Sequence, residues 1–156
     1  MNIEFTSAPA AGPIARLVDQ DAPLDGVAAA VAQGARASRF SGKTGQVHEA
    51  FVEQDGAVQR LVFAGSGDPR AKDRMAQLER AGAAVAARYL ASGETALTFD
   101  FTGSSLSPRD VAAVLLGARL RTWRYDLYRT RLPEDQKVTL TSIQASGAPD
   151  GAEEVW

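Results

Sequence analysis

Apolar residues recur along this chain with two periods, and the changes of period divide it into predicted strands and helices. Apolar and polar positions alternate in "NIEFTS" and again in "KVTLTSIQA", as they do in half-buried strands. The predicted strands comprise residues 2–7, 14–20, 47–52, 58–63, 95–101 and 137–145. Asp55-Gly56 separates the third strand from the fourth, and this dipeptide predicts a tight hairpin between them.

Three stretches between the strands show helical spacing instead. The first begins at Leu24 and is rich in alanine. The second and third open on Asp68-Pro69 and Ser107-Pro108, where a side chain can cap the first turn and proline stands where no N–H is needed. We expect Gly93 to end the second helix and the third to run into the 120s. The stripes expected to be buried are Leu24, Val27, Ala28, Val31 and Ala35; Met75, Leu78, Gly82, Val85 and Tyr89; and Leu116, Leu120, Trp123 and Leu127.

The order of these elements predicts the α/β class. Hairpins alternate with helical crossovers, which indicates a mixed β-sheet with helices packed against it. A chain of 156 residues is near the commonest size of one domain, so we expect a single hydrophobic core. The closing "SGAPDGAEEVW" is typical of a linker followed by the first turn of a further helix.

Composition narrows the classes of function. The apolar share of 45% and the charged share of 23% are ordinary for a soluble globular domain. The net charge of −2 provides no overall attraction to nucleic acid or to anionic membranes. The absence of cysteine excludes a disulfide scaffold, a thiolate zinc site and a cysteine nucleophile. Neither a leader-like N-terminus nor an apolar run of membrane-spanning length is present, so we expect a cytoplasmic protein without a membrane partner.

The stretch "ASRFSGKTG" (residues 37–45) matches the letters of a nucleotide-binding P-loop. A P-loop follows a strand and opens a helix, because the helix N-terminus faces the phosphate. Here a predicted helix comes first and a predicted strand follows. This order favours a connecting loop, and we expect Lys43 to be dispensable for any nucleotide binding.

A second glycine-containing stretch, "AGSGDP", does lie between a predicted strand and a predicted helix. Gly65, Ser66 and Gly67 are therefore candidates for an anion-binding loop. Asp68 at the helix start would repel phosphate, which favours a purely structural turn.

The segment "GARLRTWRYDLYRTR" (residues 117–131) is locally basic, with five arginines and one aspartate. Basic residues interleaved with aromatic ones can hold nucleic acid by phosphate contacts and stacking. At helical spacing the same residues form an apolar stripe beside a solvated or interface face, and this structural interpretation is favoured. The candidate interface or nucleic-acid contacts are Arg119, Arg121, Arg124, Arg129 and Arg131.

The chain offers little material for catalysis. It has a single histidine, His48, in a predicted strand, where a surface position is favoured over a metal-ligating one. Esterase and metalloprotease motifs are absent, and Ala64 stands where the first glycine of an esterase elbow would fall. We therefore assign no catalytic residue, no cofactor-binding residue and no metal ligand in this chain.

Three stretches together resemble the N-terminal domain of the leucyl (cytosol) aminopeptidase family. "FSGKTGQ" is similar to that family's phenylalanine-glycine-lysine-glycine loop after the first helix. "QRLVFAGSGDP" is similar to its strand ending in a glycine-x-glycine turn, with Ser66 where leucine is usual. "LLGARLRTWRYDLYRT" resembles the end of its last long helix, with two extra residues between Gly117 and Trp123. The residues in register there are Trp123, Tyr125, Asp126, Tyr128, Arg129 and Thr130.

The resemblance implies a macro-domain-like fold over residues 1–146, followed in residues 147–156 by a linker and the start of a helix leading to an absent catalytic domain. In this family the C-terminal domain holds two divalent metals, zinc or manganese, around a motif with no counterpart in this chain. The implied parent is a metallo-aminopeptidase that releases N-terminal residues, leucine prominently, from peptides. The implied partners are the parent's catalytic domain and neighbouring subunits of a hexamer, which the N-terminal domain helps to assemble while flanking access to the active sites.

Two other functions remain open at this stage. A stand-alone macro-like module would bind a nucleotide or ADP-ribose through loops such as residues 65–68. A DNA-binding module would use the basic segment 119–131, with an affinity that falls steeply as salt rises.

Overall fold

The computed structural model describes residues 1–8, 12–123 and 131–156. Six strands form one sheet: β1 (Asn2–Thr6), β2 (Ile14–Asp19), β3 (Val47–Gln54), β4 (Ala57–Gly67), β5 (Ala96–Asp100) and β6 (Ser142–Ser146). Their order across the sheet is β1-β6-β5-β2-β4-β3. Each neighbouring pair is parallel except β3 with β4. The predicted mixed sheet is confirmed.

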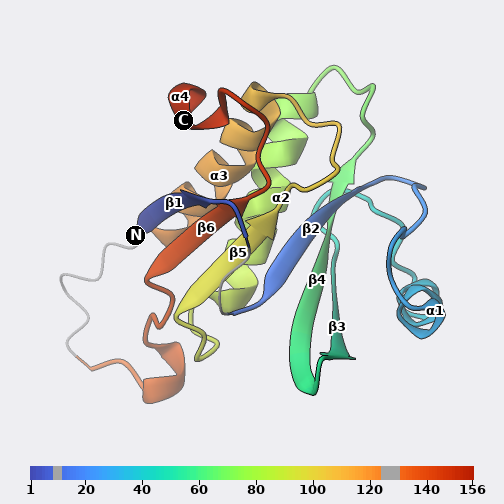
Figure 1. Ribbon diagram of the computed structural model, residues 1–156. Helices are drawn as coiled ribbons and strands as arrows, with labels where there is room; N and C mark the ends of the chain where they lie inside the picture. Colours follow the sequence, from blue (N-terminus) through green and yellow to red (C-terminus); the bar gives the residue numbers. More distant parts are fainter. Residues whose placement is uncertain (9–11, 124–130) are drawn as a thin grey trace.

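The helices in the described part of the chain are α1 (Ala29–Ala37), α2 (Arg74–Tyr89), α3 (Pro108–Thr122) and the short α4 (Ala152–Val155), with a 3-10 turn at Glu134–Gln136. Figure 1 shows α2 and α3 side by side against one face of the sheet, with α4 next to α3. The first helix, α1, stands apart from them, beside the β3 end of the sheet. The single α/β domain predicted from the sequence is therefore confirmed.

The hydrophobic core lies between the sheet and the pair α2 and α3. Alternate strand residues point into it, among them Leu97 and Phe99 of β5, both fully buried. On the opposite face β5 and β6 carry polar side chains, and Thr98 Oγ1 lies 3.4 Å from Gln144 Oε1. Alternation along β5 and β6 thus separates an apolar face from a polar one.

Two local signals in the sequence act as expected. Asp55 and Gly56 adopt φ values of 53° and 78°, the left-handed pair that a two-residue hairpin requires. Ser107 caps α3: its Oγ accepts a hydrogen bond from Asp110 N, while the Asp110 carboxylate accepts one from Ser107 N.

The predicted starts of the first two helices were wrong. α1 begins at Ala29 rather than at Leu24, because Gly26 takes a φ of +69° that a right-handed helix excludes. α2 begins at Arg74 rather than at Pro69. Asp68 caps a separate turn instead, with Arg70 N donating to Asp68 Oδ1 at 2.9 Å.

The start of the last strand was also wrong. β6 begins at Ser142, five residues later than the alternating pattern predicts. The backbone N–H groups of Thr139 and Leu140 both donate to Leu90 O, just beyond α2. The stretch before Ser142 therefore crosses the end of α2 instead of pairing with β5.

The buried face of α3 differs from the predicted one. Leu116, Leu120 and Trp123 are 39%, 62% and 73% exposed, and Leu127 lies outside the described residues. The residues of α3 that are buried are Val111, Ala113, Val114, Leu115, Gly117 and Ala118. The reason is that α3 packs against α2 through small residues, which allow the two backbones to approach closely. On α2, Leu78, Val85 and Tyr89 are buried as predicted, whereas Met75 is exposed.

Candidate functional site

The residues predicted as an anion-binding turn, Gly65, Ser66 and Gly67, form the buried end of β4. The turn prediction was wrong because β2 pairs with β4 as far as Gly67 and keeps this segment in the sheet. Ser66 Oγ donates to Asp19 Oδ1 at 2.7 Å, and Arg74 Nη2 lies 2.6 Å from the same oxygen. Anion binding here stays a prediction, and the Asp19 carboxylate is the group that would oppose it.

The segment with P-loop letters connects α1 to β3, the order expected of a structural loop. Its backbone lies against the end of β4: Gly65 N donates to Gln46 O at 2.8 Å, and Gly67 N to Gly42 O at 3.0 Å. A Cβ added at Gly65 would lie 2.0 Å from Lys43 O, so only glycine permits this approach. Two of the three stretches that carry the family resemblance are therefore packing partners.

His48 lies in β3, half-buried between two phenylalanine rings. The centroid of its ring is 6.1 Å from that of Phe40 and 6.5 Å from that of Phe63. Within residues 1–8, 12–123 and 131–156, no group of three or more histidine, cysteine, aspartate or glutamate side chains is placed to hold a metal ion. In the same ranges, no helix has the length and apolar character needed to cross a membrane.

The basic segment is only partly described. Arg119 and Arg121 are exposed in the last turn of α3, whereas Arg124 and Arg129 lie outside the described residues. The Arg119 guanidinium lies 5.7 Å from the centroid of the Trp156 ring, which ties α3 to the end of α4. Contact of the basic segment, Arg131 included, with DNA or a partner subunit stays a prediction.

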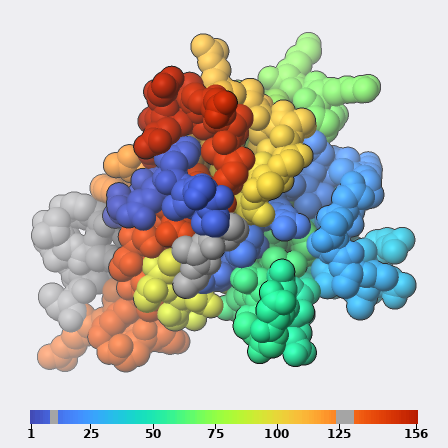
Figure 2. Space-filling model, in the orientation of Figure 1, coloured from blue at the N-terminus to red at the C-terminus, as the bar shows by residue number. Residues whose placement is uncertain are grey.

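A cavity of about 530 Å³ opens at the carboxyl ends of β2 and β5. Its walls come from the ends of these strands and from the loops that follow them, residues 22–25 and 102–106. In Figure 2 the yellow-to-orange segment after β5 lies next to the blue segment after β2. After β2 the chain goes on to β3 and β4 toward one edge of the sheet, whereas after β5 it goes on to β6 toward the other edge. Ligands of open α/β sheets bind at such a divergence of connections.

Polar groups on this cavity were not identified from the sequence. Arg16 Nε lies 3.4 Å from Asp100 Oδ2, and the arginine side chain is 41% exposed while the aspartate is 8% exposed. Asp19 lines the cavity as well and is 34% exposed. Arg16 and Asp19 belong to β2 and Asp100 to β5, so the order of strands in the sheet brings Asp100 to the other two.

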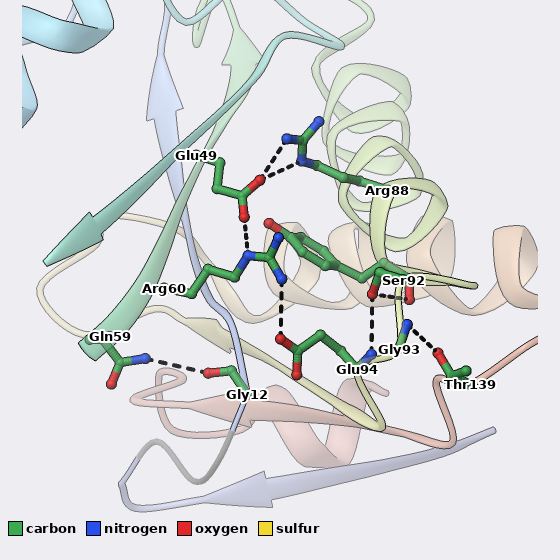
Figure 3. A network of polar contacts seen from close by, with 10 residues as sticks. Gly12, Glu49, Gln59, Arg60, Arg88, Ser92, Gly93, Glu94 and Thr139 are labelled. Atoms are coloured by element: carbon green, nitrogen blue, oxygen red, sulfur yellow. Dashed lines mark hydrogen bonds and ion pairs between the residues drawn. The ribbon is translucent and has the colours of Figure 1, made fainter. Parts of the chain in front are cut away.

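A separate network of charged side chains attaches the β3–β4 hairpin to α2 (Figure 3). The Glu49 carboxylate, 10% exposed, accepts hydrogen bonds from Arg60 Nε and from Arg88 Nη2, the latter at 2.6 Å. Arg60 Nη1 also donates to Glu94 Oε1 at 3.1 Å, and its guanidinium lies 5.2 Å from the centroid of the Tyr89 ring. One buried carboxylate thus joins two strands and a helix.

Tyr89 makes the stability of this region sensitive to alkaline pH. Burial raises the pKa of its hydroxyl above the usual value, although Arg88 and Arg60 act in the opposite direction. The fold therefore favours the neutral phenol: this contribution to stability is complete below about pH 10 and is lost as pH rises through the folded-state pKa. Tyr89→Phe should make the free energy of unfolding fall less steeply above about pH 10 in urea titrations. Parallel curves for the two proteins would contradict this assignment.

Comparison with known proteins gives one family. The sequence profile of the "Cytosol aminopeptidase family, N-terminal domain" matches residues 15–132. A probable cytosol aminopeptidase of Chelativorans sp. (strain BNC1) is 35% identical over 118 residues, which are 72% of this chain and 24% of that protein. One of Rhizobium leguminosarum bv. trifolii (strain WSM2304) is 33% identical over 131 residues, 78% of this chain and 26% of that protein. The chain thus spans about a quarter of the length of these curated relatives.

Two solved structures share the fold of this chain. A mutant of tomato leucine aminopeptidase superposes with a TM-score of 0.65 at 16% identity, over 99% of this chain and 34% of that one. The bottromycin maturation enzyme BotP, in complex with Mn, superposes with a TM-score of 0.64 at 25% identity, over 88% of this chain and 27% of that one. In each case the match covers only a part of the longer protein.

Proposed function

Because the chain belongs to the cytosol aminopeptidase family and matches its N-terminal domain, we propose that it is the non-catalytic N-terminal domain of a leucyl aminopeptidase. The extent of the match carries this proposal: most of the chain aligns with curated aminopeptidases, yet covers only 24% and 26% of the first two. The remaining three-quarters of such a parent would hold the catalytic domain. Residues 1–146 would then be the domain itself, and residues 147–156 a linker with the first turn of the helix that leads onward.

The proposed role of the domain is assembly and access rather than chemistry. The parent would be a cytoplasmic hexamer that uses two divalent metals, zinc or manganese, to release N-terminal leucine from peptides. The domain would contact its own catalytic domain and neighbouring subunits. The exposed apolar side chains on α3, Leu116 and Leu120, together with Val155 of α4, support such a contact role.

An activity assay tests the proposal directly. The chain incubated with manganese and leucyl p-nitroanilide should give no turnover above that of the metal alone, because the proposed catalytic domain is no part of it. Robust turnover that a chelator abolishes would overturn the assignment. The coding sequence after Trp156 provides an independent test: codons for a lysine- and carboxylate-rich metal domain support the proposal, and a stop codon contradicts it.

A further inference from the structure

The cavity at the ends of β2 and β5 combines opposite charges with an apolar wall. On one side is the Arg16 guanidinium, which Asp100 orients while 41% of the arginine side chain stays exposed. The carboxylates of Asp19 and Asp25 line the cavity as well. Asp19 Oδ1 accepts hydrogen bonds from Ser66 and Arg74, whereas Asp25 is exposed and has no hydrogen-bond or ion-pair partner in the described part of the chain.

The same cavity has an apolar wall. Pro23 and Leu24 come from the loop after β2, and Leu106 from the loop after β5. Phe63 and Phe101, both almost fully buried, also line the cavity. A volume of about 530 Å³ is within the usual range of small-molecule sites and exceeds what a single amino acid needs.

The balance of charge selects among small ligands. Three carboxylates and one guanidinium line the cavity, so a diphosphate such as that of ADP-ribose would meet a net negative field. A zwitterion fits better, because its negative group can pair with Arg16 while its positive group pairs with an aspartate. An apolar side chain on the carbon that carries both groups would contact the wall.

We propose that this cavity binds a free amino acid with an apolar side chain, with its carboxylate on Arg16 and its ammonium group on Asp25 and Asp19. The ligand class is the same as the product of an aminopeptidase that releases leucine. In a parent of that kind, which rests on the function proposed above, the domain would sense the amino acid that the enzyme releases.

The test is an NMR titration of the ¹⁵N-labelled chain with leucine. Saturable shifts should appear at amides around the cavity, such as Arg16, Gly103 and Leu106. Two analogues should each bind about tenfold more weakly than leucine: leucinamide, which lacks the carboxylate, and 4-methylpentanoate, which lacks the ammonium group. A tenfold loss of affinity corresponds to the loss of one ion pair worth about 1.4 kcal/mol. Equal affinity for leucine and leucinamide would overturn the proposal. So would the absence of a saturable shift up to about 10 mM leucine, because small polar ligands usually bind more tightly than that.

Matched variants separate binding from folding. Arg16→Gln should weaken leucine binding about tenfold, whereas Arg80→Gln, on the exposed face of α2, should leave it unchanged. Asp25→Asn removes an exposed charge and should weaken leucine but not 4-methylpentanoate. An Asp25→Asn protein that retains full leucine affinity would contradict the assigned orientation. These measurements use the chain alone. Leucine binding can therefore be absent although the aminopeptidase assignment is correct, and it can be present although that assignment is wrong.

Discussion

Gly82→Ala should lower the free energy of unfolding by about 2 kcal/mol, because the α2 and α3 backbones touch at this position. A Cβ added at Gly82 would lie 1.9 Å from Val114 O and 3.2 Å from Ala118 N. Both are backbone atoms of α3, so the methyl group can be accommodated only if the two helices move apart. Overpacking of this kind costs about 3 kcal/mol, and the better helix propensity of alanine returns about 1 kcal/mol.

A second glycine provides the control for Gly82. Gly34 lies in α1 with no atom within 4 Å of its added Cβ and with an ordinary φ. Gly34→Ala should therefore raise stability by about 0.5 kcal/mol, through helix propensity and a less flexible unfolded chain. Urea unfolding monitored by circular dichroism measures both. If the two variants were equally stable, the close approach of α2 and α3 would not exist.

Glu49→Gln should lower the free energy of unfolding by about 2 kcal/mol, because it breaks a buried ion network while leaving the cations in place. The carboxylate is 10% exposed and accepts from both Arg60 and Arg88. A neutral amide offers one acceptor oxygen and turns its NH₂ group toward a guanidinium. The β3–β4 hairpin would lose its principal polar attachment to α2.

The matched control for Glu49 is a solvent-exposed ion pair. Glu134 is 88% exposed and pairs with Lys137 three residues later. Glu134→Gln should change stability by less than about 0.5 kcal/mol, since solvent screens such pairs. Equal losses for the two variants would show that burial does not strengthen the Glu49 network.

The stretches that resemble the aminopeptidase family have a physical explanation in this fold. Gly42 and Gly65 belong to separate stretches, yet the backbone of the first loop lies directly against the end of β4. Glycine is needed where a side chain would collide with Lys43 O. The same arrangement explains why P-loop letters appear in a loop that follows a helix and precedes a strand: they serve close packing of two segments.

Local signals were enough to predict much of the fold. Alternation, together with β-prone and apolar runs, identified all six strands. Asp55-Gly56 and the Ser107 capping box were predictable because their conformations depend on residues that are close in sequence. The family resemblance followed from the order of three motifs and is confirmed by the match over residues 15–132.

Other features depended on residues far apart in the chain. The amphipathic pattern of α3 pointed to Leu116 and Leu120 as buried, yet the helix turns its small residues toward α2, because Gly82 lets the backbones meet. β4 extends through Gly67 because β2 pairs with it that far.

The sequence by itself determined the class of fold, the existence and order of its strands along the chain, and the family, since these follow from periodicity, turn chemistry and short motifs. Only the tertiary structure decided which face of α3 is buried and which groups meet at the ends of β2 and β5. Arg16, Asp19 and Asp100 stand in no recognisable motif. They share a cavity because the strand order places β2 beside β5 while the chain leaves these strands in opposite directions.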